Sequence, residues 1–515
     1  MIAILFLACG GEMADSAGST GDYDYNGASD DTGFMGDDSG TAGEDTTPPE
    51  QEESFLSLLP AATDAYVFVA NPDRDTVTRV AMPTLSVITA TVGHIPVSVV
   101  TTPNYTTAAT FNVGDNSVSV IDAASLHVTN VPVRNNMNRM VLSPDGRWAL
   151  LYNDPNVELD YPPASGGTLS YDEVSLVNLQ NRACTPVVVG FQPKDVAFTP
   201  DGALAVLVSD AYLGTIDLST DTAGDPVRFE VSDDLLDPPE AQEVVVSPDG
   251  AYAFVRQFGA SSLVVVDLAT GQRSLLDVGD NPTDLDLTPD GTKAIAVARG
   301  SNEIWIYDTK DPLGVLPDVV AMPASESFGS VIMNPAKSNA ILFSNATADS
   351  THYGAWSLVD DSIAVRPLVK PIETISISPD GGTALVIHTL ANGPDVEPGS
   401  SFYDKYAITL VDLDTSITNA MALAGEPIAY ANSDDGSTGF FAMKDVPEIV
   451  ALDYDKLIPE SMPLASNPIF LGVLPDSNTA WVSQEHELGR ISFYAPPSTI
   501  QTLTGFELNS AIETD

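Results

Sequence analysis

The sequence predicts an all-β protein in which about ten units of four antiparallel strands follow one another. Three observations lead to this prediction. A short turn recurs along the chain, runs of alternating apolar and polar residues flank each turn, and the third run of most units ends in a similar triplet. Alternation with a period of two is typical of half-buried strands, and no long helical period interrupts it.

The recurring turn reads Ser143-Pro144-Asp145-Gly146 in its first full copy, and four more full copies lie at 199–202, 247–250, 288–291 and 378–381. Proline presets the first central residue of a type I turn, and an aspartate carboxylate caps nearby backbone N–H groups. Glycine then adopts the left-handed conformation that returns the chain into a second strand. Each copy therefore predicts a β-hairpin, and its carboxylate is interpreted as a turn former rather than a ligand.

Degenerate copies of the turn fill the gaps at 102–104, 334–337, 433–436 and 474–477, so that nine turns recur at intervals of 41 to 56 residues. A period in this range is typical of the blades of a β-propeller. The predicted units are 62–96, 97–138, 139–193, 194–240, 241–282, 283–326, 327–372, 373–427, 428–469 and 470–515.

The third strand of a unit usually ends in two apolar residues and an acid. The acids are Asp122, Asp217, Asp267, Asp308, Asp412 and Asp453, and Asn178 is an amide variant. With the turns in the same phase, this pattern resembles the YVTN-type, WD-repeat-like β-propeller repeat of bacterial surface and periplasmic proteins, over about residues 62–515. The resemblance implies four-stranded blades arranged in a ring, and propellers carry unrelated activities.

The first unit lacks the innermost strand, strand A. We expect the segment from Gly505 to Ile512 to supply it, which would join the two ends of the chain and remove an exposed sheet edge. Ten units exceed the four to eight blades of most propellers. No linker divides the array, so one large ring is favoured and two smaller propellers are the alternative.

The chain carries 72 acidic and 20 basic residues, for a net charge of −52. Such a charge repels a phosphate backbone, so nucleic acid is not expected as a partner. The excess of acids is interpreted as a means of solubility, or as affinity for cations or for a basic partner.

Residues 1–9 resemble the end of a bacterial lipoprotein signal peptide, in which Cys9 would be acylated after cleavage. The apolar run is short and lacks a basic start, so we expect the natural signal to begin upstream. Residues 10–61 form an acidic linker rich in Gly, Ser and Asp that is expected to be disordered. Together they predict a lipoprotein of the cell envelope, on the outer membrane or the cell surface. The alternatives are an incidental apolar terminus and a periplasmic or secreted protein.

Long connections on a rigid scaffold are where binding usually occurs. The four strands of a unit are labelled A to D from the centre of the ring to its rim, and the Pro-Asp-Gly turns join strands A and B. The long insertions, 153–170, 221–240 and 391–405, are assigned to the opposite face, which carries the B–C and D–A loops. The candidate binding residues are the acids of these loops, namely Asp154, Glu158, Asp160, Asp172, Glu173, Asp233, Asp234, Asp237, Asp395, Glu397 and Asp404. Calcium is the metal that such oxygen-rich loops would hold, although no EF-hand spacing is present.

The favoured function is non-enzymatic: an anchored binding or scaffold propeller for a protein or glycan ligand, attached to the membrane through its lipid alone. No nucleophile elbow, phosphate loop or zincin helix occurs in the chain, and no cofactor is expected. Cys184 is interpreted as a small packing residue because no His or acid stands beside it. The alternatives are a lactonase-like, metal-dependent hydrolase and a purely structural envelope component.

Overall fold

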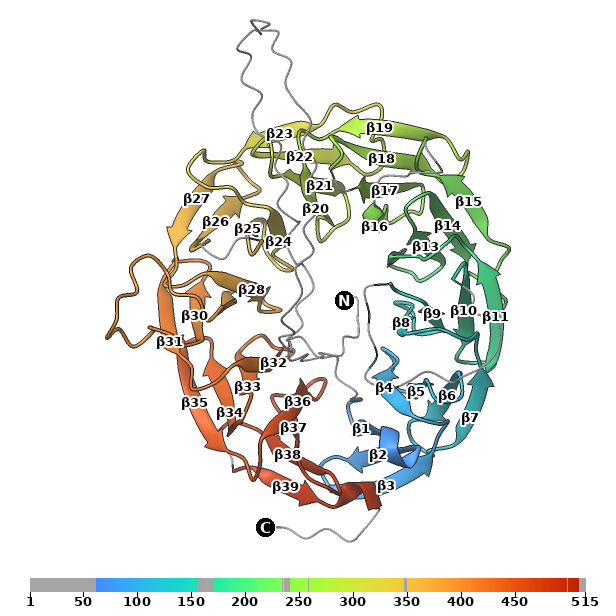
Figure 1. The fold of residues 1–515 in the computed structure, drawn as a ribbon, viewed down its shortest axis with the longest axis vertical. Coiled ribbons are helices and arrows are strands. Elements are labelled where there is room, and N and C mark those ends of the chain that lie inside the picture. The colour runs from blue at the N-terminus through green and yellow to red at the C-terminus, as the bar shows by residue number, and fades with distance from the viewer. Residues whose placement is uncertain are drawn as a thin grey trace, which may run out of the picture.

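Each repeat unit forms one blade, and the ten blades stand around a central axis in a single ring (Figure 1). The computed structural model describes residues 62–508 except 156, 158, 160, 162–170, 234, 236–240, 258, 347–349 and 498. Nine blades are antiparallel sheets of four strands, and the first has three. The predicted single ring is therefore confirmed, and the alternative of two smaller propellers is wrong.

Within a blade the strands follow one another outward in chain order, from strand A at the channel to strand D at the rim (Figure 1). Blade 1 contains β1 (Tyr66–Asn71), β2 (Thr76–Ala81) and β3 (Ser86–Thr91), with the 3-10 helix η1 (Pro72–Arg74) after β1. Blades 2 to 4 contain β4 (Pro96–Thr101), β5 (Thr107–Asn112), β6 (Ser117–Asp122), β7 (Val128–Pro132), β8 (Arg139–Leu142), β9 (Trp148–Tyr152), β10 (Glu173–Asn178), β11 (Ala183–Val188), β12 (Asp195–Phe198), β13 (Leu204–Val208), β14 (Tyr212–Asp217) and β15 (Val227–Glu230).

Blades 5 to 7 contain β16 (Ala241–Val246), β17 (Tyr252–Gln257), β18 (Ser262–Asp267), β19 (Arg273–Asp277), β20 (Pro282–Leu287), β21 (Lys293–Ala298), β22 (Glu303–Asp308), β23 (Asp318–Ala321), β24 (Ser330–Met333), β25 (Asn339–Phe343), β26 (His352–Ser357) and β27 (Ile363–Pro367). Blades 8 to 10 contain β28 (Ile372–Ile377), β29 (Thr383–His388), β30 (Ala407–Asp412), β31 (Thr418–Ala422), β32 (Pro427–Asn432), β33 (Thr438–Met443), β34 (Val446–Asp453), β35 (Ile458–Pro463), β36 (Pro468–Val473), β37 (Ala480–Gln484), β38 (Arg490–Tyr494) and β39 (Gln501–Thr504). The 3-10 helix η2 (Phe506–Leu508) ends the described chain.

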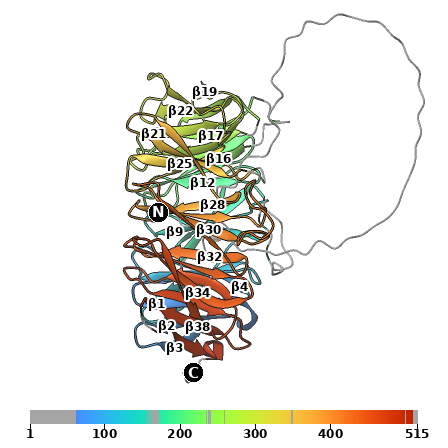
Figure 2. The same ribbon diagram turned by 90° about the vertical axis from the view of Figure 1, so that its left-hand side faces the viewer.

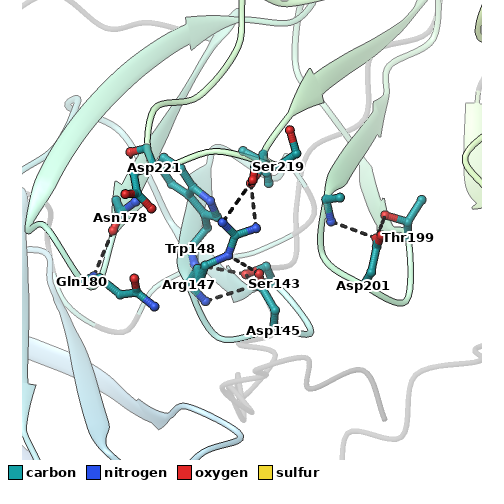
Figure 3. Close-up of polar contacts among 12 residues, drawn as sticks. Ser143, Asp145, Arg147, Trp148, Asn178, Gln180, Thr199, Asp201, Ser219 and Asp221 are labelled. Atoms are coloured by element: carbon teal, nitrogen blue, oxygen red, sulfur yellow. Dashed lines mark hydrogen bonds and ion pairs between the residues drawn. The ribbon is translucent and has the colours of Figure 1, made fainter.

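The Pro-Asp-Gly turns connect strands A and B as the sequence predicts. In blade 3, the Ser143 hydroxyl donates to Asp145 Oδ1 at 2.6 Å, and the same oxygen accepts the Arg147 N–H at 3.0 Å. Gly146 has a φ of 69°, the left-handed value that the turn requires. Figure 3 shows this turn beside its equivalent in blade 4, where Thr199 and Asp201 make the same contact at 2.7 Å. The carboxylate of the repeat is therefore a turn former.

The acid at the end of strand C has a similar local task in the turn between strands C and D. Asp122 accepts the Ser125 N–H at 2.7 Å, and this backbone donor lowers the pKa of the Asp122 carboxyl. Asn178 accepts the N–H groups of Gln180 and Asn181 at 2.9 and 3.0 Å in the same way (Figure 3). The polar side chains of both repeated motifs therefore stabilise hairpin turns, and the candidate functional residues have to be sought elsewhere in the blades.

The hydrophobic core is divided among the interfaces between blades. The described residues form ten apolar clusters, and each contains side chains of two neighbouring blades. Trp148 and Trp356 are almost fully buried in two of these clusters, as expected for packing residues. The blades therefore hold one another in place through apolar burial, which is the main favourable term in folding.

The ring closes by side-chain packing between blades 10 and 1. One cluster joins Val67 and Val80 of blade 1 to Trp481, Phe493 and other residues of blade 10. Blade 1 lacks strand A, as predicted, and an isolated bridge from Ala62 to Val67 lies at that edge of β1. The expectation that the segment from Gly505 supplies strand A is wrong for its described part. Phe506–Leu508 forms η2 instead, whose Phe506 is buried in the closing cluster.

The ring is a disc with two faces, seen edge-on in Figure 2. The A–B and C–D turns lie on one face, and the B–C and D–A connections lie on the other. Long B–C connections in blades 3 and 8 separate β9 from β10 and β29 from β30, as predicted. The assignment of 221–240 to the B–C and D–A face is wrong in part: β15 begins at Val227, so residues 221–226 belong to a C–D connection on the opposite face. Blade 6 also has a long C–D connection, at 309–317.

Candidate functional site

The described loop acids singled out by the sequence are mostly engaged in contacts with the protein itself. Asp154 is 2% exposed and accepts Arg139 Nη1 at 2.6 Å. Glu173 pairs with Arg134 at 2.9 Å. Asp233 contacts Arg273, and Asp404 accepts the Asn392 amide at 2.7 Å. Asp172, Asp395 and Glu397 are exposed.

The structure does not bring these acids together into one cluster. Within the described ranges, no group of three or more His, Cys, Asp or Glu side chains is arranged to hold a metal ion. Glu158, Asp160, Asp234 and Asp237 lie outside the described residues, as do Cys9 and the linker 10–61. The calcium site and the lipid anchor therefore stay predictions.

A second set of charged residues lies on the inner strands, apart from the loop acids that the sequence predicts as candidates. We define the belt position as the residue four places before the one that opens each A–B turn. The belt residues are Ser98, Arg139, Asp195, Glu243, Asp284, Ser330, Thr374, Ala429 and Phe470. In six blades a β-bulge immediately precedes this position, for example between Ala241 and Glu243. Bulges re-aim side chains, and here they affect six of the nine belt residues, among them Glu243 and Asp284 but not Asp195.

Three consecutive belt residues form an arc of carboxylates on blades 4 to 6. Each accepts a backbone N–H of strand A in the next blade. Asp195 accepts the Val244 N–H at 2.9 Å, and Glu243 accepts the Leu285 N–H at 3.0 Å. Asp284 accepts the Val331 N–H at 2.5 Å. The acidic arc, as we call these three residues, therefore joins the inner strands of four neighbouring blades.

Two arginines belong to the same side of the channel. Arg256 is buried on β17 and donates from Nε to Glu243 at 3.0 Å. Arg139 occupies the belt position of blade 3, and its charge acts on Asp195. These cations offset part of the charge, which makes a row of partly buried carboxylates tolerable in a folded protein.

Burial raises the pKa of the carboxyl groups in this region. It does so for Asp195, and for Glu243 it outweighs the opposing effect of Arg256. Asp286 lies two residues after Asp284 on the same strand. Its pKa rises from an ordinary value of 3.8 to about 7, first through burial and second through the charge of Asp284. Asp286 is therefore an acid that changes its protonation near neutral pH.

Replacing Asp286 by asparagine is expected to change how stability depends on pH. A raised folded-state pKa means that the folded chain binds the proton more tightly, so the native chain loses stability as pH rises from about 4 to about 7. Asparagine cannot ionise, so the variant should be more stable at pH 8 by about 1–3 kcal/mol, since one pKa unit corresponds to about 1.4 kcal/mol and the site is partly open to solvent. Urea unfolding at pH 4.5 and pH 8 measures this difference. Asp395→Asn, at an exposed position, is the control, and equal slopes in all three chains would contradict the expectation.

The opposite side of the channel has an apolar character. Phe470 takes the belt position of blade 10 and is 43% exposed, and the preceding Ile469 is 41% exposed. β36 lies across the ring from β16 and β20 (Figure 1). The channel mouth on the B–C and D–A face therefore has the partly exposed carboxyl groups of Asp195 and Glu243 on one side and large apolar side chains on the other, while Asp284 is buried.

The long loop of blade 8, residues 389–406, is held by a buried lysine at the entrance to strand A. Lys370 is fully buried, and its ammonium donates to the carbonyl oxygens of Leu390 at 3.0 Å, Phe402 at 3.2 Å and Lys405. Burial lowers the pKa of Lys370. All three N–H donors of the ammonium are thus used within the protein, which gives this residue a structural role.

Two further residues of types that can bind metals or act as nucleophiles, His388 and Cys184, also have structural roles. His388 is buried between the Pro371 carbonyl and the Thr409 hydroxyl, and burial lowers its pKa to about 4. Cys184 is half-buried against the cluster between blades 2 and 3, and burial raises the pKa of its thiol. A thiol with a raised pKa is a poor nucleophile, in keeping with the packing role expected from the sequence.

The chain was compared with known proteins. No protein-family model matches it, and no curated protein sequence matches it. Among solved structures it is similar to a eukaryotic initiation factor, with a TM-score of 0.51 and 13% identity over 78% of this chain and 96% of that one. It is also similar to the dihydro-heme d1 dehydrogenase NirN in complex with DHE, with a TM-score of 0.46 and 16% identity over 70% and 74% of the two chains. The hydrazine synthase of Kuenenia stuttgartiensis matches with a TM-score of 0.32 and 16% identity over 76% and 99%.

Identities this low show the propeller fold alone, so function has to be argued from the site. In the part of the chain that the structure describes, no helix is long and apolar enough to cross a bilayer.

Proposed function

We propose that this protein is a non-enzymatic binding propeller that engages a protein ligand at the channel mouth on the B–C and D–A face. The observation that carries the proposal is the division of the channel mouth into the acidic arc, with Asp286 beside it, and the apolar side formed by Ile469 and Phe470. Belt residues elsewhere in the ring are mostly small or neutral, such as Ser98, Ser330 and Ala429. A ligand that carries basic and apolar side chains together would match both sides.

The charge of the whole chain supports the same kind of ligand. A net charge of −52 attracts basic partners over long distances and raises their association rate, an effect that salt weakens. The carboxyl groups of the acidic arc are held by backbone N–H groups of the next blade, so the fold fixes their positions along the channel.

Replacing Phe470 by alanine is expected to weaken binding without unfolding the protein, because the side chain is 43% exposed. Truncation of an aromatic anchor commonly costs about 1–3 kcal/mol, or roughly 5- to 150-fold in Kd. An array of peptides that vary in charge and apolar content, probed with the whole purified chain, measures the loss. Ile88→Ala, at an exposed position on the outer strand of blade 1, is the control. Acidic peptides that bind as well as basic ones would refute the proposal.

One observation favours the alternative of a lactonase-like hydrolase. Asp286, with a pKa of about 7, has the proton affinity of a general base at neutral pH. A screen for lactone hydrolysis, with and without calcium, separates the two functions. Hydrolysis that disappears in the variant Asp286→Asn would establish the enzyme and contradict the binding proposal.

We further propose that the propeller is held at the cell envelope through a lipid on Cys9, with residues 10–61 as its tether. The proposal is supported by the apolar run before Cys9 and by the acidic composition of the segment that follows. Labelling of the expressed protein with a clickable fatty acid, with Cys9→Ala as the control, tests it. Equal labelling of the two chains would overturn it.

A further inference from the structure

A groove opens between blades 6 and 7 on the face that carries the A–B and C–D turns. Its volume is about 510 Å³, whereas the cavity between blades 2 and 3 measures about 20 Å³. The A–B turns of both blades border it, and so do β22, β23 and the C–D turn of blade 7. This groove lies on the face opposite to the channel mouth discussed above, so it is a separate site.

The groove lies where the stacking of the repeated turns is interrupted. In the full copies the turn glycine packs against the turn of the preceding blade: a Cβ at Gly291 would come within 2.2 Å of Pro248, and one at Gly202 within 2.8 Å of Asp145. In blade 7 the glycine is replaced by Lys337. Its side chain extends to Asp414 of blade 8, at 2.7 Å, and so away from blade 6.

The turn of blade 7 also has a different backbone. Asn334 Oδ1 accepts the N–H groups of Ala336 and Lys337 at 3.0 and 3.1 Å. Neither Ala336 nor Lys337 has the positive φ of the turn glycines, which is 65° at Gly291 and 69° at Gly381. The sequence change at 336–337 therefore accounts for the break in the ring of turns beside the groove.

One strongly exposed apolar side chain lines the groove, and others lie on the chain segment around its lining residue Asp318. Val359 lines it and is 82% exposed. The C–D connection of blade 6 leads into the lining residue Asp318 and carries Leu316 at 89%, Leu313 at 50% and Val315 at 45% exposed, and Val319 follows on β23 at 46%. A group of exposed apolar residues at one place on a soluble protein usually marks an interaction surface.

The charges around the groove are negative where they are not already neutralised. Lys293 and Lys337 are paired with Asp308 at 3.5 Å and Asp414 at 2.7 Å. Asp318 and Asp361 line the groove and are exposed, and neither forms an ion pair within the described part of the chain. A second copy of this chain, which also carries a charge of −52, would be repelled from such a surface.

We propose that this groove docks an extended segment of a partner protein in which apolar side chains alternate with lysine or arginine. The apolar side chains would cover Leu316 and Val359, and the basic groups would reach Asp318 and Asp361. The two surfaces of the protein would then serve different segments, one at the channel mouth and one in this groove.

A fluorescent peptide of alternating leucine and lysine is the probe, and anisotropy titration of the whole chain is the measurement. The double variant Leu316→Ser/Val359→Ser should raise the Kd of the groove at least tenfold. Ala336→Asp/Lys337→Gly restores the Pro-Asp-Gly turn and should have the same effect by closing the groove. Ile417→Ser is the control, because Ile417 is 60% exposed at the C–D turn of blade 8, and no residue of blade 8 lines the groove.

The channel mouth is distinguished by a second pair of titrations. Phe470→Ala should leave binding in the groove unchanged. The native chain should therefore show two classes of peptide site. The channel-mouth variant should retain only the groove site, and the groove variants should retain only the channel-mouth site. The proposal is overturned if the groove variants bind like the native chain, if a leucine–glutamate peptide binds equally well, or if sedimentation shows that the surface joins two copies of the protein.

Discussion

Replacement of Asp154 by alanine is expected to destabilise the protein by about 3–5 kcal/mol, the usual consequence of removing one partner of a buried ion pair. Asp154 is 2% exposed and Arg139 is 8% exposed, with 2.6 Å between Oδ2 and Nη1. The variant would leave the guanidinium buried beside the channel without this carboxylate. Chemical denaturation of the whole chain, followed by tryptophan fluorescence, measures the loss.

A matched control lies among the same loop acids. Asp395 is exposed, and its replacement by alanine should change the free energy of unfolding by less than about 0.5 kcal/mol. Similar values for the two variants would show that the buried ion pair between Asp154 and Arg139 does not stabilise the protein.

Replacement of Lys370 by methionine is the second change with a large expected effect. Three carbonyl oxygens would lose their donor, and each unpaired buried acceptor costs about 1–3 kcal/mol, so the variant should lose about 3 kcal/mol or release the loop 389–406. Asn392 and Asp404 bond to each other across this loop, in both directions, at 2.7 and 2.9 Å. Local release should therefore appear as new proteolytic cleavage between residues 389 and 406, together with a lower urea midpoint.

Lys405→Met provides the control in the same loop, because the Lys405 side chain is exposed and only its backbone carbonyl contacts Lys370. This variant should resist protease like the native chain. If Lys370→Met resisted protease equally and kept the native midpoint, the ammonium would not be what holds the loop.

The prediction of the functional site from sequence was limited by one feature of strand A. Asp195, Glu243 and Asp284 belong to strands whose alternation is typical of ordinary packing, so the sequence pattern favours the acids in loops as candidates. A signal was nevertheless present: these charged residues all stand four places before the turn. Which of them meet across blades depends on the bulges and on the ring, and neither can be deduced from local spacing.

The groove between blades 6 and 7 illustrates the same limit. The sequence marks the turn at 334–337 as degenerate, yet degenerate turns also occur in blades 2 and 10. At those turns a residue with positive φ is retained, Tyr105 at 60° and Asp476 at 56°, whereas none occurs at 336–337. Whether the loss of the turn glycine opens a groove depends on the neighbouring blade, because the turn packs against that blade.

The sequence by itself determined the hairpins, their phase and the number of blades, because the turn and the end of strand C are built from hydrogen bonds between residues at most five places apart. The tertiary structure alone decided how the ring closes, which acids are buried and where the two candidate surfaces lie. These depend on contacts between residues about 40 or more places apart, such as Asp195 with Val244 and Arg74 with Glu507. Local chemistry fixes a repeat, but only the packing of one repeat against the next decides what each exposed or buried charge can do.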